Sequence, residues 1–136
     1  MKIDVPNVAE QQAFIFEQAT KAAIAQLLAN LNAPRIPLQA NQTAWANTHL
    51  LREREGWEPP SADVVGAYFR HFQEHFPDYG TDAKLADLLY GPGCDRRKIR
   101  AIKNGTVAVP YRIWRRFLIL TGRVPEDITP VMAFMG

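Results

Sequence analysis

Three arginines and an asparagine share one side of a short segment of the chain: Arg96, Arg97, Arg100 and Asn104. At 100° per residue these four side chains fall within about a 100° arc, and Ile99 and Ile102 lie about 60° apart on the other side. Guanidinium groups donate paired hydrogen bonds to guanine edges and to phosphates, and an asparagine amide pairs with adenine. The spacing therefore predicts a helix that is docked by its isoleucines and presents its polar side to a nucleic acid.

The surrounding stretch is strongly basic. Between residues 96 and 123 there is no acidic residue and there are nine basic ones: Arg96, Arg97, Lys98, Arg100, Lys103, Arg112, Arg115, Arg116 and Arg123. The whole chain has a net charge of only +2, but residues 1–80 carry −3 and residues 81–136 carry +5. We therefore expect only the C-terminal half to face a polyanion.

Helix signals frame this basic segment. Thr81 is a good N-cap for a helix with Leu85, Leu88 and Leu89 as its buried stripe. Asp95 can cap the following helix, and Gly105 supplies the left-handed position that ends it. A third helix is expected from Pro110 to Leu120, with Ile113, Phe117 and Leu120 facing the core.

These residues resemble the lambda repressor and Cro-like (Xre-type) helix-turn-helix family. The resemblance rests on Thr81–Ala86 (TDAKLA), Ile99–Gly105 (IRAIKNG) and the Pro110–Leu120 helix followed by Thr121-Gly122, and it covers Ser61 to Gly122. The chain departs from the family in the extra residues 90–92 of the turn and in Lys103, where the family usually has Glu. The resemblance implies an all-α bundle and sequence-specific binding of duplex DNA, as in a bacterial, phage or mobile-element transcriptional regulator.

The resemblance and the charge pattern together assign expected contacts. Base contacts are expected from Asp82, Arg96, Arg97, Arg100 and Asn104. Phosphate contacts are expected from Thr81, Lys98, Lys103, Arg112, Arg115 and Arg116. We expect no catalytic residue, no metal and no cofactor.

The rest of the chain is expected to be helical as well, with an N-terminal region over residues 1–58 and the DNA-binding domain with its tail over residues 59–136. Helices are expected over Val8–Leu31, over Thr43–Glu55 and from Ser61 to His75. Cys94 is the single cysteine, which excludes an intramolecular disulfide and a multi-cysteine zinc site. We expect Cys94 to pack in the core.

The first of these helices carries an apolar stripe: Phe16, Thr20, Ile24, Leu27 and Leu31. The stripe could pack on its own domain, form a homodimer or bind a protein partner. A protein partner would make the chain an antitoxin-like autoregulator. We expect a homodimer through this stripe in preference to the apolar tail, residues 131–135, because its spacing persists over several turns.

A competing motif is His71-Phe72-Gln73-Glu74-His75, which matches the H-x-x-E-H zinc signature of inverted zincin peptidases. His71 and His75 could share a metal, and Glu74 could act as general base. The neighbouring phenylalanines and the small size of the chain favour two partly exposed histidines instead. With no signal peptide and no long apolar run, we expect a soluble, cytoplasmic protein without membrane contact.

Overall fold

A computed structural model describes residues 5, 7–39 and 42–135, and the secondary structure of these residues is entirely helical. The expected all-α class is confirmed for this part of the chain. The other residues, including the first four of the expected N-terminal region, lie outside the description. The chain divides into two units, Leu38–Ile128 and Met1–Pro37 with Thr129–Gly136. The boundary expected between residues 58 and 59 falls inside the larger unit, Leu38–Ile128.

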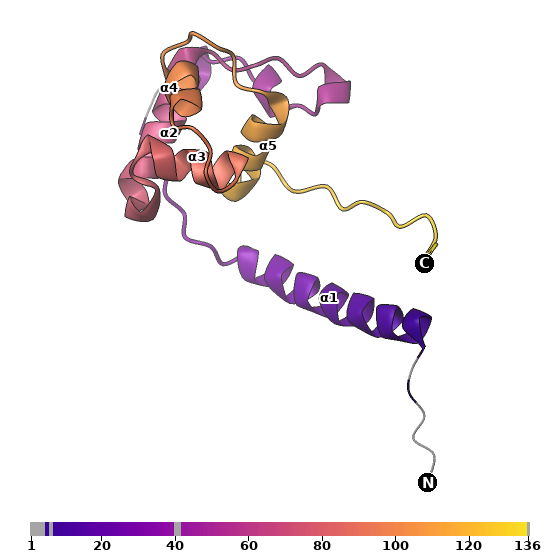
Figure 1. Cartoon of the computed structure of the whole chain (residues 1–136). Coiled ribbons are helices and arrows are strands. Elements are labelled where there is room, and N and C mark those ends of the chain that lie inside the picture. Colours follow the sequence, from indigo (N-terminus) through magenta and orange to yellow (C-terminus); the bar gives the residue numbers. More distant parts are fainter. Residues whose placement is uncertain (1–4, 6, 40–41, 136) are drawn as a thin grey trace. The chain divides into compact units, whose positions relative to one another are not determined.

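Four α-helices of the larger unit surround one core: α2 (Ala62–His75), α3 (Asp82–Tyr90), α4 (Arg97–Lys103) and α5 (Tyr111–Leu120) (Figure 1). Their starts follow the chemistry expected from the sequence. The hydroxyl of Ser61 accepts a hydrogen bond from the Val64 amide, and that of Thr81 accepts one from the Lys84 amide. Helix α5 begins directly after Pro110, which has extended dihedral angles.

The core is aromatic and takes side chains from all four helices. Trp114 is fully buried and stacks on Tyr68 and Phe117, while Phe69 packs edge-on against Phe117. The remaining buried residues are Val64, Val65, Phe72, Leu85, Ala86, Leu89, Ile99, Ile102, Val109, Leu118 and one polar side chain, His49. Helix α4 contributes Ile99 and Ile102 to this core.

The face that α5 buries differs from the expected one. Leu120, expected to point inward, is 46% exposed, whereas Trp114 and Leu118 are fully buried. Ile113 is only partly buried against the core. The indole of Trp114 is the largest apolar group on the helix, and burying it rotates the inward face toward residues 114 and 118.

The prediction of a helix over Thr43–Glu55 is wrong. The described part of this segment forms three 3-10 turns: Gln42–Ala44, Thr48–Leu50 and Glu53–Glu55. The backbone is extended at Leu51 and Arg52, where the Arg52 guanidinium binds the Asp127 carboxylate through two hydrogen bonds of 2.7 Å. Residues 43–49 are mostly poor helix formers, so these tertiary contacts outweigh the apolar spacing.

The smaller unit contains α1 (Val8–Asn30), one continuous helix (Figure 1). It ends one residue before the expected Leu31. A capping box starts it, because the Asn7 side chain accepts from the Glu10 amide and the Glu10 carboxylate accepts from the Asn7 amide. None of its residues is buried. None of the described helices is long and apolar enough to cross a membrane.

Candidate nucleic-acid interface

Helix α4 has the two faces that its spacing predicts. Ile99 is fully buried and Ile102 is 3% exposed, whereas Arg96, Arg97, Lys98 and Arg100 are all exposed. The helix begins one residue later than expected, with Arg96 at the N-cap position. The Asp95 carboxylate nevertheless accepts a 2.9 Å hydrogen bond from the Arg97 amide, as expected for a cap. The basic side chains of α4 therefore lie opposite the residues that dock it.

The end of α4 is built by a tight turn. Gly105 has a φ of +79°, the left-handed conformation expected for a residue that ends a helix. The side-chain oxygen of Asn104 accepts hydrogen bonds from both the amide and the hydroxyl of Thr106. That oxygen is therefore committed to the turn, and the amide nitrogen of Asn104 is the group that it can still offer to a base.

Lys103 and Asp82, expected at phosphate and base contacts, form a partly buried ion pair with each other. The Lys103 ammonium donates to Asp82 Oδ1 and to Gln73 Oε1, each at 2.7 Å. Arg100 Nε lies 3.6 Å from the second oxygen of the same carboxylate. Burial raises the pKa of Asp82, but the bonds and charges of Lys103, Gln73 and Arg100 outweigh burial and leave this pKa below its usual value. These contacts tie α2, α3 and α4 together.

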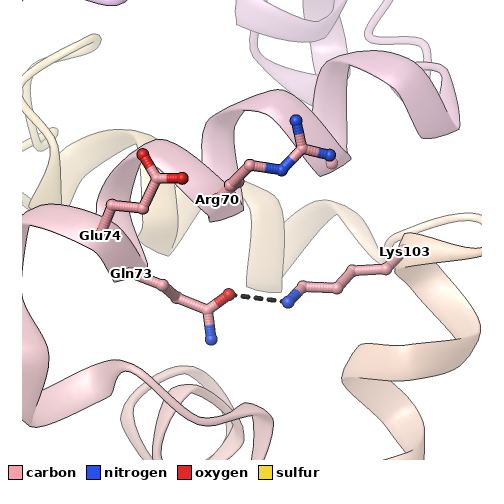
Figure 2. Close-up of a pocket in the computed structure, with 5 residues that line it drawn as sticks. Arg70, Gln73, Glu74 and Lys103 are labelled. Atoms are coloured by element: carbon pink, nitrogen blue, oxygen red, sulfur yellow. Dashed lines mark hydrogen bonds between the residues drawn. The ribbon is translucent and has the colours of Figure 1, made fainter.

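Figure 2 shows part of this arrangement, in which Gln73 accepts the hydrogen bond of Lys103. The two residues lie in an open depression of about 260 Å³, whose other lining residues are Gly66, Arg70 and Glu74. Gln73 also donates to the backbone oxygen of Tyr79. Gln73 was not predicted as a site residue, because a glutamine on a half-exposed helix face makes no recognisable pattern.

The three expected phosphate contacts on α5 are placed differently from one another. Arg112 is exposed. Arg115 is half-buried and donates to the backbone oxygen of Leu50 at 3.1 Å. Arg116 is exposed and donates through Nε to the backbone oxygen of Leu88, near the end of α3, at 2.9 Å. Arg115 and Arg116 therefore connect elements of the bundle. The guanidinium of Arg123, the last residue of the basic run, lies 3.8 Å from the centre of the Tyr68 ring.

The turn between α3 and α4 runs from residue 91 to residue 96. Gly91 and Gly93 both have positive φ, and the Gly93 amide donates to the Asp87 carboxylate at 3.2 Å. Tyr90, the first of the extra residues, is the last residue of α3, and the ammonium of Lys98 lies 5.0 Å from the centre of its ring. Cys94 is partly buried and packs against the core.

The H-x-x-E-H segment lies at the end of α2. The two imidazole rings pack against each other with centroids 4.5 Å apart, and Nδ1 of His75 lies 2.8 Å from the backbone oxygen of His71. The Glu74 side chain is exposed. Among the described residues, no three His, Cys, Asp or Glu side chains are gathered where they could hold a metal ion.

Comparison of the chain with protein-family models, with curated proteins and with solved structures finds no match. The candidate interface is therefore defined by its own geometry. It comprises the exposed basic side of α4, with Thr81 at the start of α3 and Arg112 at the start of α5.

Proposed function

We propose that residues 61–122 form a helix-turn-helix domain of the Cro and repressor type that binds duplex DNA sequence-specifically. In this proposal α3 is the supporting helix and α4 is the helix that enters the major groove. The observation that carries the proposal is that α4 buries Ile99 and Ile102 on one side, while Arg96, Arg97, Lys98 and Arg100 are exposed. An exposed helix with basic side chains opposite its buried side fits the major groove.

The residues expected to contact bases or phosphates fall into two groups, according to the contacts that they make within the protein. Arg96, Arg97 and Arg100 reach base edges, where each guanidinium can donate two parallel hydrogen bonds to a guanine. Asp82 and Lys103 instead hold α4 at a fixed angle, because they are partly buried and hydrogen-bonded to each other, whereas Arg100 beside Asp82 is exposed. A fixed angle is needed for base reading, since small rotations of the helix move the arginines off their bases.

The proposed contacts to the DNA backbone come from three exposed residues: Thr81, Lys98 and Arg112. The Thr81 hydroxyl already accepts a bond from the Lys84 amide and keeps its proton to donate to a phosphate. Lys98 and Arg112 add positive charge that carries no sequence information and positions the domain on the duplex. Such a protein would act as a transcriptional regulator.

The decisive experiment is selection of bound sequences from random duplex DNA, followed by fluorescence anisotropy with the selected site. We expect one preferred site and a loss of about 1–3 kcal/mol for each removed base contact in Arg96→Ala/Arg100→Ala. The matched control is Arg35→Ala/Arg54→Ala, which removes the same charge from exposed positions outside α4 and should keep nearly full affinity.

Two results would overturn the proposal. One is a selection that yields no preferred sequence from a folded protein. The other is full affinity of the Arg96→Ala/Arg100→Ala variant for a selected site. A helical circular dichroism spectrum must accompany both measurements, and it should be unchanged because neither arginine is buried.

A further inference from the structure

Helix α1 has large apolar side chains, yet none of its residues is buried. At 100° per residue, six of its residues and the residue after it fall into a narrow arc of about 80° along its whole length. We name this surface the α1 stripe, and it consists of Ala9, Ala13, Phe16, Thr20, Ile24, Leu27 and Leu31. Most of the stability of a helix in a protein comes from packing of its apolar face, so we expect the stripe to be covered along its length of about 35 Å.

The α1 stripe has one polar member, Thr20, and its hydroxyl already has a hydrogen-bond partner within the helix. Thr20 lies at the middle of the stripe, and its hydroxyl donates a 2.8 Å hydrogen bond to the backbone oxygen of Phe16. A hydroxyl that is bonded within its own helix can be covered by apolar groups without leaving a donor unsatisfied. The stripe can therefore be covered along its full length.

We propose that the occupant of the α1 stripe is the same stripe of a second copy, running antiparallel about a two-fold axis at Thr20. This pairing sets small residues against large ones at both ends. Ala13 lies opposite the partner's Leu27, and Ala9 lies opposite the partner's Leu31. Phe16 lies opposite the partner's Ile24 on each side of the axis. Alternating small and large side chains is how facing helices fill the space between them.

The charges of α1 favour the antiparallel orientation. Glu17 and Lys21 lie on one flank of the stripe and pair with each other at 3.1 Å. A two-fold axis perpendicular to the helices brings this flank against the same flank of the second copy, so that Glu17 faces the partner's Lys21. A parallel pair would set this flank against the other one, which carries the uncharged residues Gln12, Ala19, Ala23 and Asn30.

The C-terminal tail adds to the same apolar surface. The Phe134 ring packs edge-on against Phe16 with centroids 5.0 Å apart, so the tail meets the α1 stripe directly. Val131, Met132 and Met135 of the same tail are more than half exposed. A lipid surface is a poorer occupant, because Lys21 is the only basic residue of α1 and anionic headgroups attract helices with basic flanks.

Sedimentation equilibrium of the full chain at tens of micromolar, without DNA, tests the pairing. We expect a dimer for the wild type and a monomer for Ile24→Asp/Leu27→Asp. The matched control is Gln18→Asp/Gln26→Asp, which adds the same charge to the other side of the helix, and it should remain a dimer. A wild-type monomer, with or without binding to anionic vesicles, overturns the proposal, and so does a dimeric Ile24→Asp/Leu27→Asp variant.

Disulfide trapping in a Cys94→Ala background tests the orientation. In the antiparallel pair, Thr20→Cys should link to itself across the axis, and Ala13→Cys should link to Leu27→Cys in a mixture of the two variants. Ala13→Cys alone should stay unlinked. Efficient self-linking of Ala13→Cys would establish a parallel pair and overturn the proposed register. Because neither experiment uses DNA, their outcome is independent of the function proposed for α4.

Discussion

The indole Nε1–H of Trp114 donates a 3.1 Å hydrogen bond to Nδ1 of His49. An indole can only donate, so Nδ1 of His49 is unprotonated and its proton is carried by Nε2. The imidazole is the one buried polar side chain among the described residues, and it also packs against the Tyr68 ring. This bond fastens the 3-10 segment before α2 to the centre of the core, and Trp57 reinforces it by donating to the backbone oxygen of His49.

The first prediction is a loss of stability in mild acid. Burial, with the positive charge of Arg123, lowers the pKa of His49, so the unfolded state takes up its proton first. The stabilising contribution is complete above the ordinary value of 6.5 and is lost as the pH falls from there toward the folded-state pKa. The loss is at most about 1.4 kcal/mol per pH unit for one group. Urea unfolding followed by tryptophan fluorescence between pH 8 and pH 5 measures it.

Two variants isolate the contribution of His49. His49→Gln keeps an acceptor for the Trp114 N–H but cannot be protonated, so the slope below pH 6.5 should disappear. His71→Gln/His75→Gln removes the other two histidines and should keep the slope. If the slope follows His71 and His75 instead, the assignment to the buried His49 is wrong.

The second prediction concerns the ion pair between α3 and α4. Asp82→Asn and Lys103→Met should each destabilise the fold, and a double-mutant cycle should give a coupling of about 1–2 kcal/mol, because both charges are partly buried and hydrogen-bonded. The folded-state pKa of Asp82 is lowered, so this stability is present above its unfolded pKa and is lost as the pH falls through the folded pKa. An additive cycle in chemical denaturation at pH 7 would contradict the coupling.

The third prediction contrasts two glycines. Gly105 has a φ of +79°, and a Cβ there would lie 3.2 Å from the Cβ of Ala62, so Gly105→Ala should destabilise the protein by about 1–2 kcal/mol. Gly66 lies within α2 and has open space where a Cβ would project, so Gly66→Ala should stabilise the protein by up to about 1 kcal/mol. Thermal unfolding of both variants checks the sign of each effect, and the same sign for both would refute the contrast.

Local signals explain why most of the fold was predictable. Ser61 and Thr81 cap α2 and α3, and Gly105 ends α4, each through bonds or dihedral angles that depend only on nearby residues. Ile99 and Ile102 are the two large apolar residues of α4, so its buried side was predictable as well. The segment around His49 was not, because its conformation depends on Trp114, which lies 65 residues away.

The candidate site was predictable only in part, for a related reason. Charge and spacing identify the exposed arginines of α4, but they cannot show which basic side chains have internal partners. Lys103 binds Asp82 and Gln73, and Arg115 binds a backbone oxygen of the 3-10 segment. These partners come from elements whose relative placement is set by the aromatic core and not by local sequence.

The last prediction uses this difference on α5. Arg112 is exposed, so Arg112→Ala should weaken specific and nonspecific DNA binding together, lower the salt dependence by about one unit and leave stability unchanged. Arg116 donates to the Leu88 oxygen, one of the last carbonyls of α3, where a cation also favours the negative end of the helix. Arg116→Ala should therefore lower stability, by about 0.5–1 kcal/mol at this exposed site, and weaken DNA binding less than Arg112→Ala does. Anisotropy titrations from low to moderate salt, together with chemical denaturation, separate the two effects. A loss of affinity by Arg112→Ala at one base position only would show that Arg112 reads sequence and does not contact the backbone.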